Sequence, residues 1–295
     1  MSARKADLNP WVQDAQLHRS LPGTLHFRMD LILYILTGAV SGFLAGLLGI
    51  GGGLIIVPAL AYTLPHAGYG PPVLMQTAIG SSLAVIVFTA VSSIRAHHRA
   101  GYVEWPLVRA IAPGVCVGAL SGALLASQLS GESLRVIYLA FLLGAATQML
   151  LELRPAGGAE PGPLAYAAAG VVIGVFSSLV GIGGGTLSTP FLLWCRRSIH
   201  AAVASSAAIG LPIALSGSVG FVLAGLDHAD LPDGSIGFVA WPAVLLVGAV
   251  SVLLAPLGAT LAHRVPQRPL KRFFACLLLV LAARILYEMM TGPSA

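Results

Sequence analysis

After a polar tail at residues 1–30, the chain alternates between long apolar stretches and short polar segments. A helix needs about 20 consecutive apolar residues to cross a bilayer, and most of the apolar stretches are close to that length. The pattern therefore predicts an all-α integral membrane protein that crosses the bilayer several times. The apolar stretches lie at about 31–64, 73–94, 106–128, 135–152, 164–194, 201–225, 238–262 and 270–290.

The first and fifth apolar stretches are too long for one straight crossing, and each contains the run Gly-Ile-Gly-Gly-Gly. Glycine inside a helix costs about 1 kcal/mol relative to alanine, so four glycines in five residues predict an interruption. With a shift of 132 positions, Gly42–Leu60 and Gly174–Leu192 are identical at nine of 19 residues. The same broken segment is therefore used twice, and Pro58 and Pro190 are expected to end it in each copy.

The rest of the chain also divides into two related halves. The stretch Ala78–Ile86 parallels Ala202–Gly210, and Gly101–Val108 parallels Gly237–Val244. A duplicated membrane bundle is typical of transporters, although duplication also serves structure alone in some proteins. Each repeat is expected to hold a glycine-broken long segment followed by three transmembrane helices. The predicted organisation is a polar tail (1–30), a first repeat (31–153), a Pro/Gly-rich linker (154–163), a second repeat (164–290) and a short tail (291–295).

Basic residues indicate how the repeats are oriented. If each broken segment enters the membrane and returns, nine basic residues share one side, and the acidic stretch Asp227–Asp233 lies on the other. Short loops rich in Arg and Lys mark the cytoplasmic side. This favours inverted repeats in the cell inner membrane with the N-terminal tail outside, although the four basic residues of the tail favour the opposite. The nine residues are Arg95, Arg99, Arg154, Arg196, Arg197, Arg264, Arg268, Lys271 and Arg272.

Composition excludes several classes of protein. Only 9% of the residues are charged and the mean hydropathy is +0.88, whereas soluble domains carry about 25% charged residues. The net charge of +5 does not indicate a nucleic-acid partner, because the chain has only two lysines and its arginines lie at segment ends. Cys116, Cys195 and Cys276 are isolated, which predicts neither a metal site nor a disulfide framework. No cofactor is expected, since a nucleotide-binding glycine motif would need glycines where Leu54 and Thr186 stand.

The glycine runs also indicate a binding function. Non-helical backbone at membrane depth is tolerated only where protein or a water-filled cavity covers it. Half-helices that begin at such a break direct partial positive charge and free N–H groups toward it, which is an anion-binding arrangement. The two breaks are expected to meet near the bilayer midplane. The alternative is tight helix packing, which is the role expected of the small-residue patterns Gly42/Gly46 and Gly114/Gly118/Gly122.

Hydroxyl pairs recur at matched places after each break. Ser81 and Ser82 in the first half correspond to Ser205 and Ser206 in the second. Such hydroxyls often bond the carbonyls of their own helix, but their recurrence also favours ligand binding. The predicted substrate-binding residues are Gly49, Gly51, Gly52, Gly53, Thr77, Ser81, Ser82, Gly181, Gly183, Gly184, Gly185, Ser205 and Ser206.

A basic loop, Arg95–Trp105, follows the second apolar stretch. It either anchors the chain at the cytoplasmic surface or attracts an anion to the cytoplasmic mouth through Arg95, His97, His98 or Arg99. The adjacent histidines point about 100° apart on a helix, and no carboxylate lies at ligand spacing, so a metal site is not expected there.

The chain resembles the TauE/SafE sulfite exporter family of membrane proteins. The paired glycine runs and the stretches Ser92–Trp105 and Ala208–Gly225 carry the likeness, which covers about residues 31–290. The resemblance implies two related halves and the transport of sulfite, sulfonates or other small sulfur-containing anions. The chain departs from the family pattern by its long N-terminal tail and by an acidic insertion near Asp227–Asp233.

These observations leave three classes of function open. Every carboxylate lies in a loop, in the tail or near a segment end, so no mid-membrane acid is placed to relay protons. Export of a small anion driven by the membrane potential is therefore favoured, with proton-coupled anion uptake as the alternative. A membrane enzyme is disfavoured because the histidines lie at segment ends, away from the mid-span serines. A non-transporting partner in a membrane assembly is the third class.

Overall fold

The computed structural model describes residues 23–48, 52–151, 161–262 and 267–291. These residues form helices joined by loops, the longest of which (226–240) contains an isolated β-bridge between Ser235 and Ala240. Seven of the described helices are long and apolar enough to cross a membrane. The prediction of an all-α, multi-pass membrane protein is therefore confirmed.

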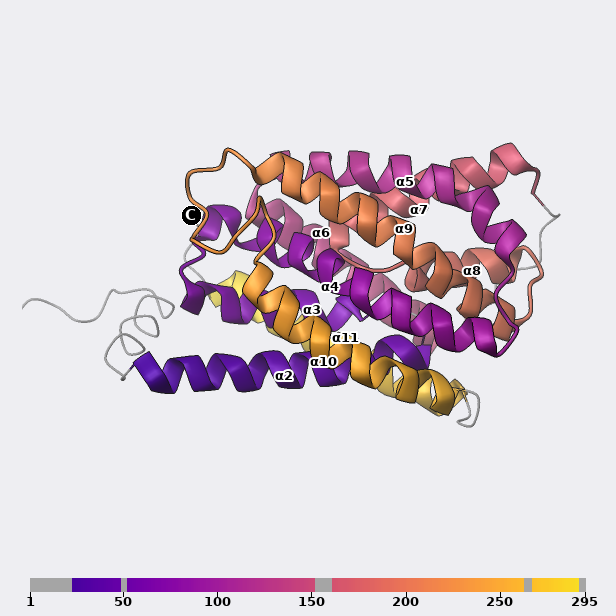
Figure 1. Ribbon diagram of the computed structural model, residues 1–295, viewed down its shortest axis with the longest axis horizontal. Helices are drawn as coiled ribbons and strands as arrows, with labels where there is room; N and C mark the ends of the chain where they lie inside the picture. Colours follow the sequence, from indigo (N-terminus) through magenta and orange to yellow (C-terminus); the bar gives the residue numbers. More distant parts are fainter. Residues whose placement is uncertain (1–22, 49–51, 152–160, 263–266, 292–295) are drawn as a thin grey trace, which may run out of the picture.

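The order of elements is the same in the two halves (Figure 1). A long helix and a short helix open each half, and three long helices follow. The first half comprises α2 (Gly23–Leu48), α3 (Gly53–Thr63), the 3₁₀ turn η1 (Leu64–Ala67), α4 (Pro71–Arg99), α5 (Trp105–Gln128) and α6 (Gly131–Leu150). The second comprises α7 (Pro163–Val180), α8 (Gly185–Trp194), α9 (Ile199–Gly225), α10 (Trp241–Ala262) and α11 (Gln267–Thr291).

Both halves are interrupted at the glycine run. α7 ends at Val180 because Gly181 adopts a left-handed conformation (φ 74°) and its N–H bonds the carbonyl of Ser177. In the first half, Gly52 has a φ of 77° and directly precedes α3. A Cβ at Gly52 would lie 2.8 Å from the carbonyl oxygen of Ser41, so α3 begins beside the last third of α2. The short helix therefore doubles back along α2 and does not continue it.

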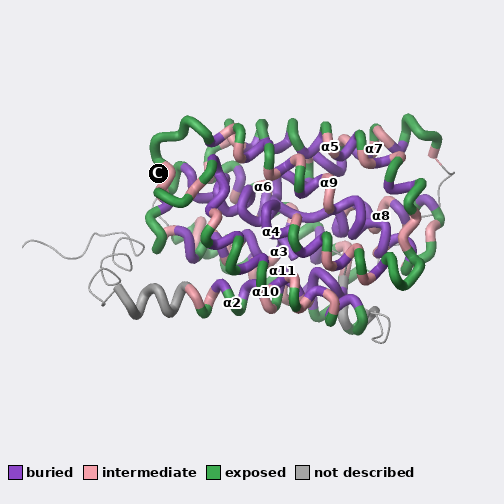
Figure 2. The backbone as a smooth tube through the Cα atoms, viewed as in Figure 1, coloured by how far each residue is buried: buried purple, intermediate pink, exposed green. Residues whose placement is uncertain are grey.

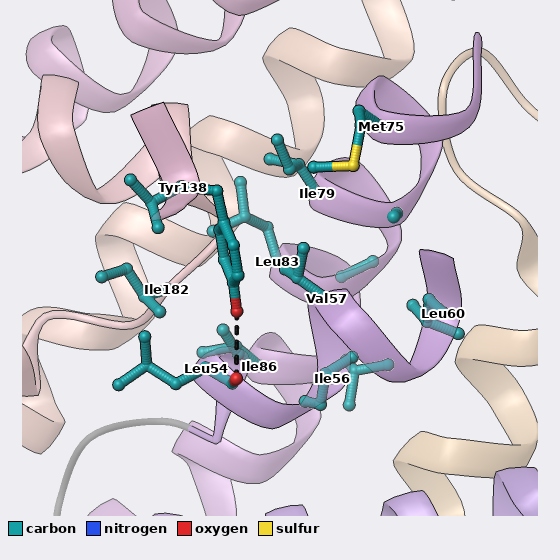
Figure 3. Packing of buried hydrophobic residues seen from close by; sticks show 14 of the residues in the cluster. Leu54, Ile56, Val57, Leu60, Met75, Ile79, Leu83, Ile86, Tyr138 and Ile182 are labelled. Atoms are coloured by element: carbon teal, nitrogen blue, oxygen red, sulfur yellow. Dashed lines mark hydrogen bonds between the residues drawn. The ribbon is translucent and has the colours of Figure 1, made fainter. Parts of the chain in front are cut away.

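Both prolines of the broken segments lie inside the short helices, so the expectation that they end these segments is wrong. Pro58 has no N–H, which leaves the carbonyl of Leu54 without its helical donor. The hydroxyl of the buried Tyr138 on α6 donates to that carbonyl at 3.0 Å (Figure 3). α3 continues past Pro58 because a side chain from another helix replaces the missing hydrogen bond.

The halves pack against each other through stripes of small residues. α5 lies along α7, and α10 lies along α2. A Cβ at Gly118 would overlap the carbonyl oxygen of Val171 on α7, and one at Gly42 would overlap the backbone of Ser251 on α10. Such close contact requires glycine and confirms the packing role expected of these patterns. The glycines that make contacts of this kind include Gly42, Gly46, Gly114, Gly118 and Gly122.

The core of the bundle lies around α4 and α9 (Figure 2). The apolar part of α4 is the most buried of the candidate spans, whereas α6 and α11, which pack together, are the least buried. Polar groups on the inner faces of α4 and α9 are therefore shielded from lipid.

The two halves run in opposite directions in Figure 1, since α2 begins at the left end of the bundle and α7 at the right end. At the right end, Arg197 before α9 lies 3.4 Å from Glu104 before α5. At the left end, the Tyr69 hydroxyl lies 2.7 Å from Ser235 Oγ. Burial raises the pKa of Tyr69, with the Ser235 hydrogen bond offsetting part of the shift, so this contact persists at neutral pH. Inverted repeats require two halves that run in opposite directions, as these do. The orientation of the two halves relative to a membrane stays a prediction.

Cysteine-accessibility labelling is expected to place the 100–104 loop and the start of α11 on the cytoplasmic side and the 226–240 loop outside. Single cysteines at Ala100, Arg272 and Asp230, in a variant without the three native cysteines, would be probed with a membrane-impermeant reagent. Labelling of the Ala100→Cys and Arg272→Cys proteins from opposite sides would contradict the inverted arrangement.

Candidate functional site

The two breaks are in contact with each other. A Cβ at Gly53, the first residue of α3, would overlap the carbonyl oxygen of Gly181 and come 2.8 Å from Ile182 Cα. A Cβ at Gly181 would come 2.9 Å from Val57 on α3. The prediction that the breaks meet is therefore confirmed, and only glycine leaves room for the contact.

Two hydroxyls fix the second broken segment against the central helices. Ser82 Oγ on α4 donates a hydrogen bond to the carbonyl of Gly181 at 2.8 Å. Thr189 Oγ1 on α8 donates to Ser206 Oγ on α9 at 2.9 Å. Both serines are fully buried, and a buried carbonyl without a partner would cost about 1–3 kcal/mol. These bonds therefore stabilise the interruption in its observed shape.

Ser81 and Ser205 form matched contacts between the halves. Ser81 Oγ accepts a hydrogen bond from the N–H of Ala240 at 2.9 Å, and Ser205 Oγ accepts one from the N–H of Glu104 at 3.0 Å. Ala240 and Glu104 directly precede α10 and α5, so they are equivalent positions in the two halves. Each half therefore uses its central helix to hold a loop of the other half.

Replacing Ser81 with alanine is expected to lower the free energy of unfolding by about 1–3 kcal/mol, because the N–H of Ala240 loses its acceptor. Thermal unfolding of the purified protein in detergent measures the change. Ser127→Ala is the matched control, since the Ser127 hydroxyl bonds the Leu124 carbonyl of its own helix. Equal losses in the two variants would contradict a role between the halves.

A small hollow with room for about one water molecule lies beside the second glycine run, between α2, α4 and α9. Because this space is smaller than an oxyanion, binding of an anion here requires the surrounding helices to move apart. The residues that line it are buried and carry no ionisable group. Its polar lining comes from Thr89 and Ser93 on α4, from Ser206 on α9, and from the backbone of Gly183 and Gly184.

Among the described residues, several hydroxyls at the hollow and on α8 make no hydrogen bond. Ser93 is 4% exposed and its Oγ is unpartnered among the described residues, whereas Thr89 bonds the carbonyls of its own helix. Thr186 and Ser188, near the start of α8, are also buried without a partner for their hydroxyls. The first helical bond of α8 runs from Ser188 N to Gly184 O at 2.7 Å, so the amides before it lack an intrahelical partner. Hydroxyl groups and backbone N–H groups therefore lie together near the start of α8, and donors of these two kinds stabilise a negatively charged ligand.

Comparison with known proteins identifies the family. The family model described as sulfite exporter TauE/SafE matches residues 34–285. The chain belongs to the TauE/SafE sulfite exporter family. It is 37% identical over 254 residues to a probable membrane transporter protein of Haemophilus influenzae, covering 85% of this chain and 96% of that one. It is 26% identical over 281 residues to the probable membrane transporter protein YunE of Bacillus subtilis, covering 88% and 98%. No solved structure matches the chain.

In this TauE/SafE family member, the predicted substrate-binding residues occupy different surroundings. Gly183, Gly184 and Ser206 line the hollow. Thr77 is buried on α4, and its hydroxyl has no partner within the described part of the chain. Gly185 begins α8. The contacts within and between the halves described above involve Gly52, Gly53, Gly181, Ser81, Ser82 and Ser205. Two of the predicted residues, Gly49 and Gly51, fall outside the described residues. Contact of any of them with a substrate stays a prediction.

Sequence reasoning missed Ser93 and Thr89. Both lie on the face of α4 that carries Ser82, because positions 82, 86, 89 and 93 are separated by four, three and four residues. This spacing is the signal that would have found them, since it extends the recognised serine face by three turns.

The basic stretch at the end of α4 lies outside the hollow. Arg95, His98 and Arg99 are exposed, whereas His97 is 2% exposed. Trp105 Nε1 donates a hydrogen bond to His98 Nδ1 at 3.1 Å, which requires that nitrogen to be unprotonated. An anion-attracting role and a membrane-anchoring role both stay open for this stretch.

Proposed function

We propose that this protein moves small anions of the sulfite or organosulfonate type out of the cell. The observation that carries the proposal is the hollow beside the second glycine run, where buried hydroxyls and the N-terminal end of α8 gather. Hydroxyl and N–H donors in apolar surroundings stabilise anions, and half-helix N-termini do the same in other transporters. The family's description supports sulfite, and the names of the relatives support transport.

The distribution of acidic residues supports export. Among the described residues, carboxylates lie in loops or within about two turns of a helix end, so none is placed at mid-span to relay protons. An inside-negative potential already drives a monoanion outward, with about 2.3 kcal/mol per charge for each 100 mV. Export of a monoanion therefore needs no coupling ion, whereas uptake would need one.

The experiment is anion flux through the purified protein in liposomes. Vesicles loaded with sulfite or an alkylsulfonate would receive a potential that is negative inside, imposed by a potassium gradient with valinomycin. Efflux is expected to follow the imposed potential in the absence of a proton gradient. An absolute requirement for a proton gradient would favour the uptake permease, and no flux of any tested anion would overturn transport.

A further inference from the structure

The hydroxyl of Ser93 lines the hollow and makes no hydrogen bond to any other described residue. Ser93 is buried and only 4% exposed. Among the other lining hydroxyls, Thr89 donates to carbonyls of its own helix, and the oxygen of Ser206 accepts from Thr189. A buried polar group without a partner is costly, so a hydroxyl of this kind at a cavity wall is available to bind a water molecule or a ligand.

The hollow offers no cation that could balance a second negative charge. None of its lining residues is ionisable. On α4, the ionisable side chains beyond Ser93 are the buried His97, one turn further along, and the exposed Arg95, His98 and Arg99. The other elements at this end of the bundle contribute His200 on α9, Tyr166 on α7 and the ion pair Arg197–Glu104.

Charge then decides which anions enter. The cost of moving an ion out of water rises with the square of its charge, so a dianion costs about four times as much as a monoanion of the same size. Neutral hydroxyls and amides offset much of the cost of moving a monoanion out of water. For a dianion, the same cost normally has to be offset by a paired cation or a metal ion. A site built from Ser93, Ser206 and the end of α8 therefore discriminates by charge.

We propose that Ser93 is a substrate-binding residue and that this hollow accepts only singly charged oxyanions, so that sulfite passes as hydrogen sulfite. The inference rests on the proposed function. It adds the protonation state of the substrate and a residue that holds it.

The pH dependence of flux tests the charge selection. Hydrogen sulfite loses its proton near neutral pH, whereas methanesulfonate stays singly charged throughout this range. At a fixed total concentration below saturation, sulfite flux is expected to fall roughly tenfold for each pH unit above the pKa of hydrogen sulfite. Methanesulfonate flux is expected to stay constant. Protein-free liposomes correct for passive leak of the uncharged form.

Each other outcome of the pH experiment has a distinct meaning. A parallel fall for both anions would show that a protein group such as His97 titrates, and would overturn the charge selection. Constant or rising sulfite flux would show that the dianion is carried, with the same consequence. If the protein carries neither anion at any pH, the proposed function itself fails.

Replacing Ser93 with alanine tests the residue. The KM for both anions is expected to rise roughly 10- to 100-fold, since a hydrogen bond to a charged group is lost. The variant is expected to fold, because the hydroxyl has no protein partner to leave unpaired. Ser92→Ala is the matched control, since the Ser92 hydroxyl donates to the Val252 carbonyl on α10 at 3.0 Å. An unchanged KM in a folded Ser93→Ala protein would overturn the assignment.

Discussion

Replacing Gly184 with valine is expected to abolish anion flux while the protein still folds. Gly184 has a φ of −57°, which valine adopts without backbone strain. A Cβ there would lie 3.1 Å from Ser188 Oγ and 3.2 Å from Gly210 N, so the neighbours must yield by a few tenths of an ångström. Overpacking of this kind costs about 1–3 kcal/mol, which a folded bundle tolerates. The added methyl groups occupy the wall of the hollow next to the first turn of α8, where the anion is proposed to bind.

The measurement is initial flux in liposomes at equal protein content, on variants whose thermal unfolding has first been recorded in detergent. Gly144→Val is the matched control, because a Cβ at Gly144 on α6 would meet nothing within 4 Å. Gly184→Ala, with a smaller side chain, is expected to retain part of the flux. A folded Gly184→Val protein with normal transport would mean that the second glycine run serves packing and that the anion binds elsewhere.

The helices and their duplication were predictable because a bilayer constrains both length and polarity. Apolar stretches near 20 residues identify spans with little help from tertiary context. The interruptions were also predictable, since glycines as dense as those at 181–185 are incompatible with a continuous helix. Their mutual contact followed from the duplication, which places equivalent breaks where the halves face each other.

The partners of individual side chains were not predictable in the same way. Ser81 and Ser82 are adjacent in the sequence, yet their partners differ. Ser81 Oγ accepts from the N–H of Ala240, and Ser82 Oγ donates to the carbonyl of Gly181. Periodicity tells which residues share a helix face, but it does not tell which group lies opposite. Pro58 is a second example. α3 continues past Pro58 because Tyr138, 80 positions away in the sequence, supplies the hydrogen-bond donor that the proline lacks.

The packing glycines show a further limit of sequence reasoning. A small-residue pattern predicts that two helices approach, but the degree of approach decides what a substitution costs. At Gly118, a Cβ would overlap the Val171 carbonyl, whereas at Gly144, also inside a transmembrane helix, it would meet open space. Alanine is therefore expected to disrupt helix packing at Gly118 and to be tolerated at Gly144. In the sequence, both positions are simply a glycine in an apolar helix.

Replacing Gly53 with alanine is expected to destabilise the protein by about 3 kcal/mol or more, the upper end of what overpacking costs. A Cβ at this position would overlap the carbonyl oxygen of Gly181 and come 2.8 Å from Ile182 Cα. Both obstacles are backbone atoms of the opposite break, and Ser82 fixes that carbonyl with a 2.8 Å hydrogen bond, so neither can move aside as a flexible side chain would.

The loss should appear as a lower unfolding temperature and a smaller monodisperse fraction in detergent. Gly70→Ala is the matched control, since Gly70 has an ordinary φ of −74° and a Cβ there would make only a 3.5 Å contact with Pro72. If Gly53→Ala unfolds at the same temperature as the unsubstituted protein, the two breaks do not meet through their backbones. The hollow beside the second break would then have to be explained without the contact between the halves that positions it.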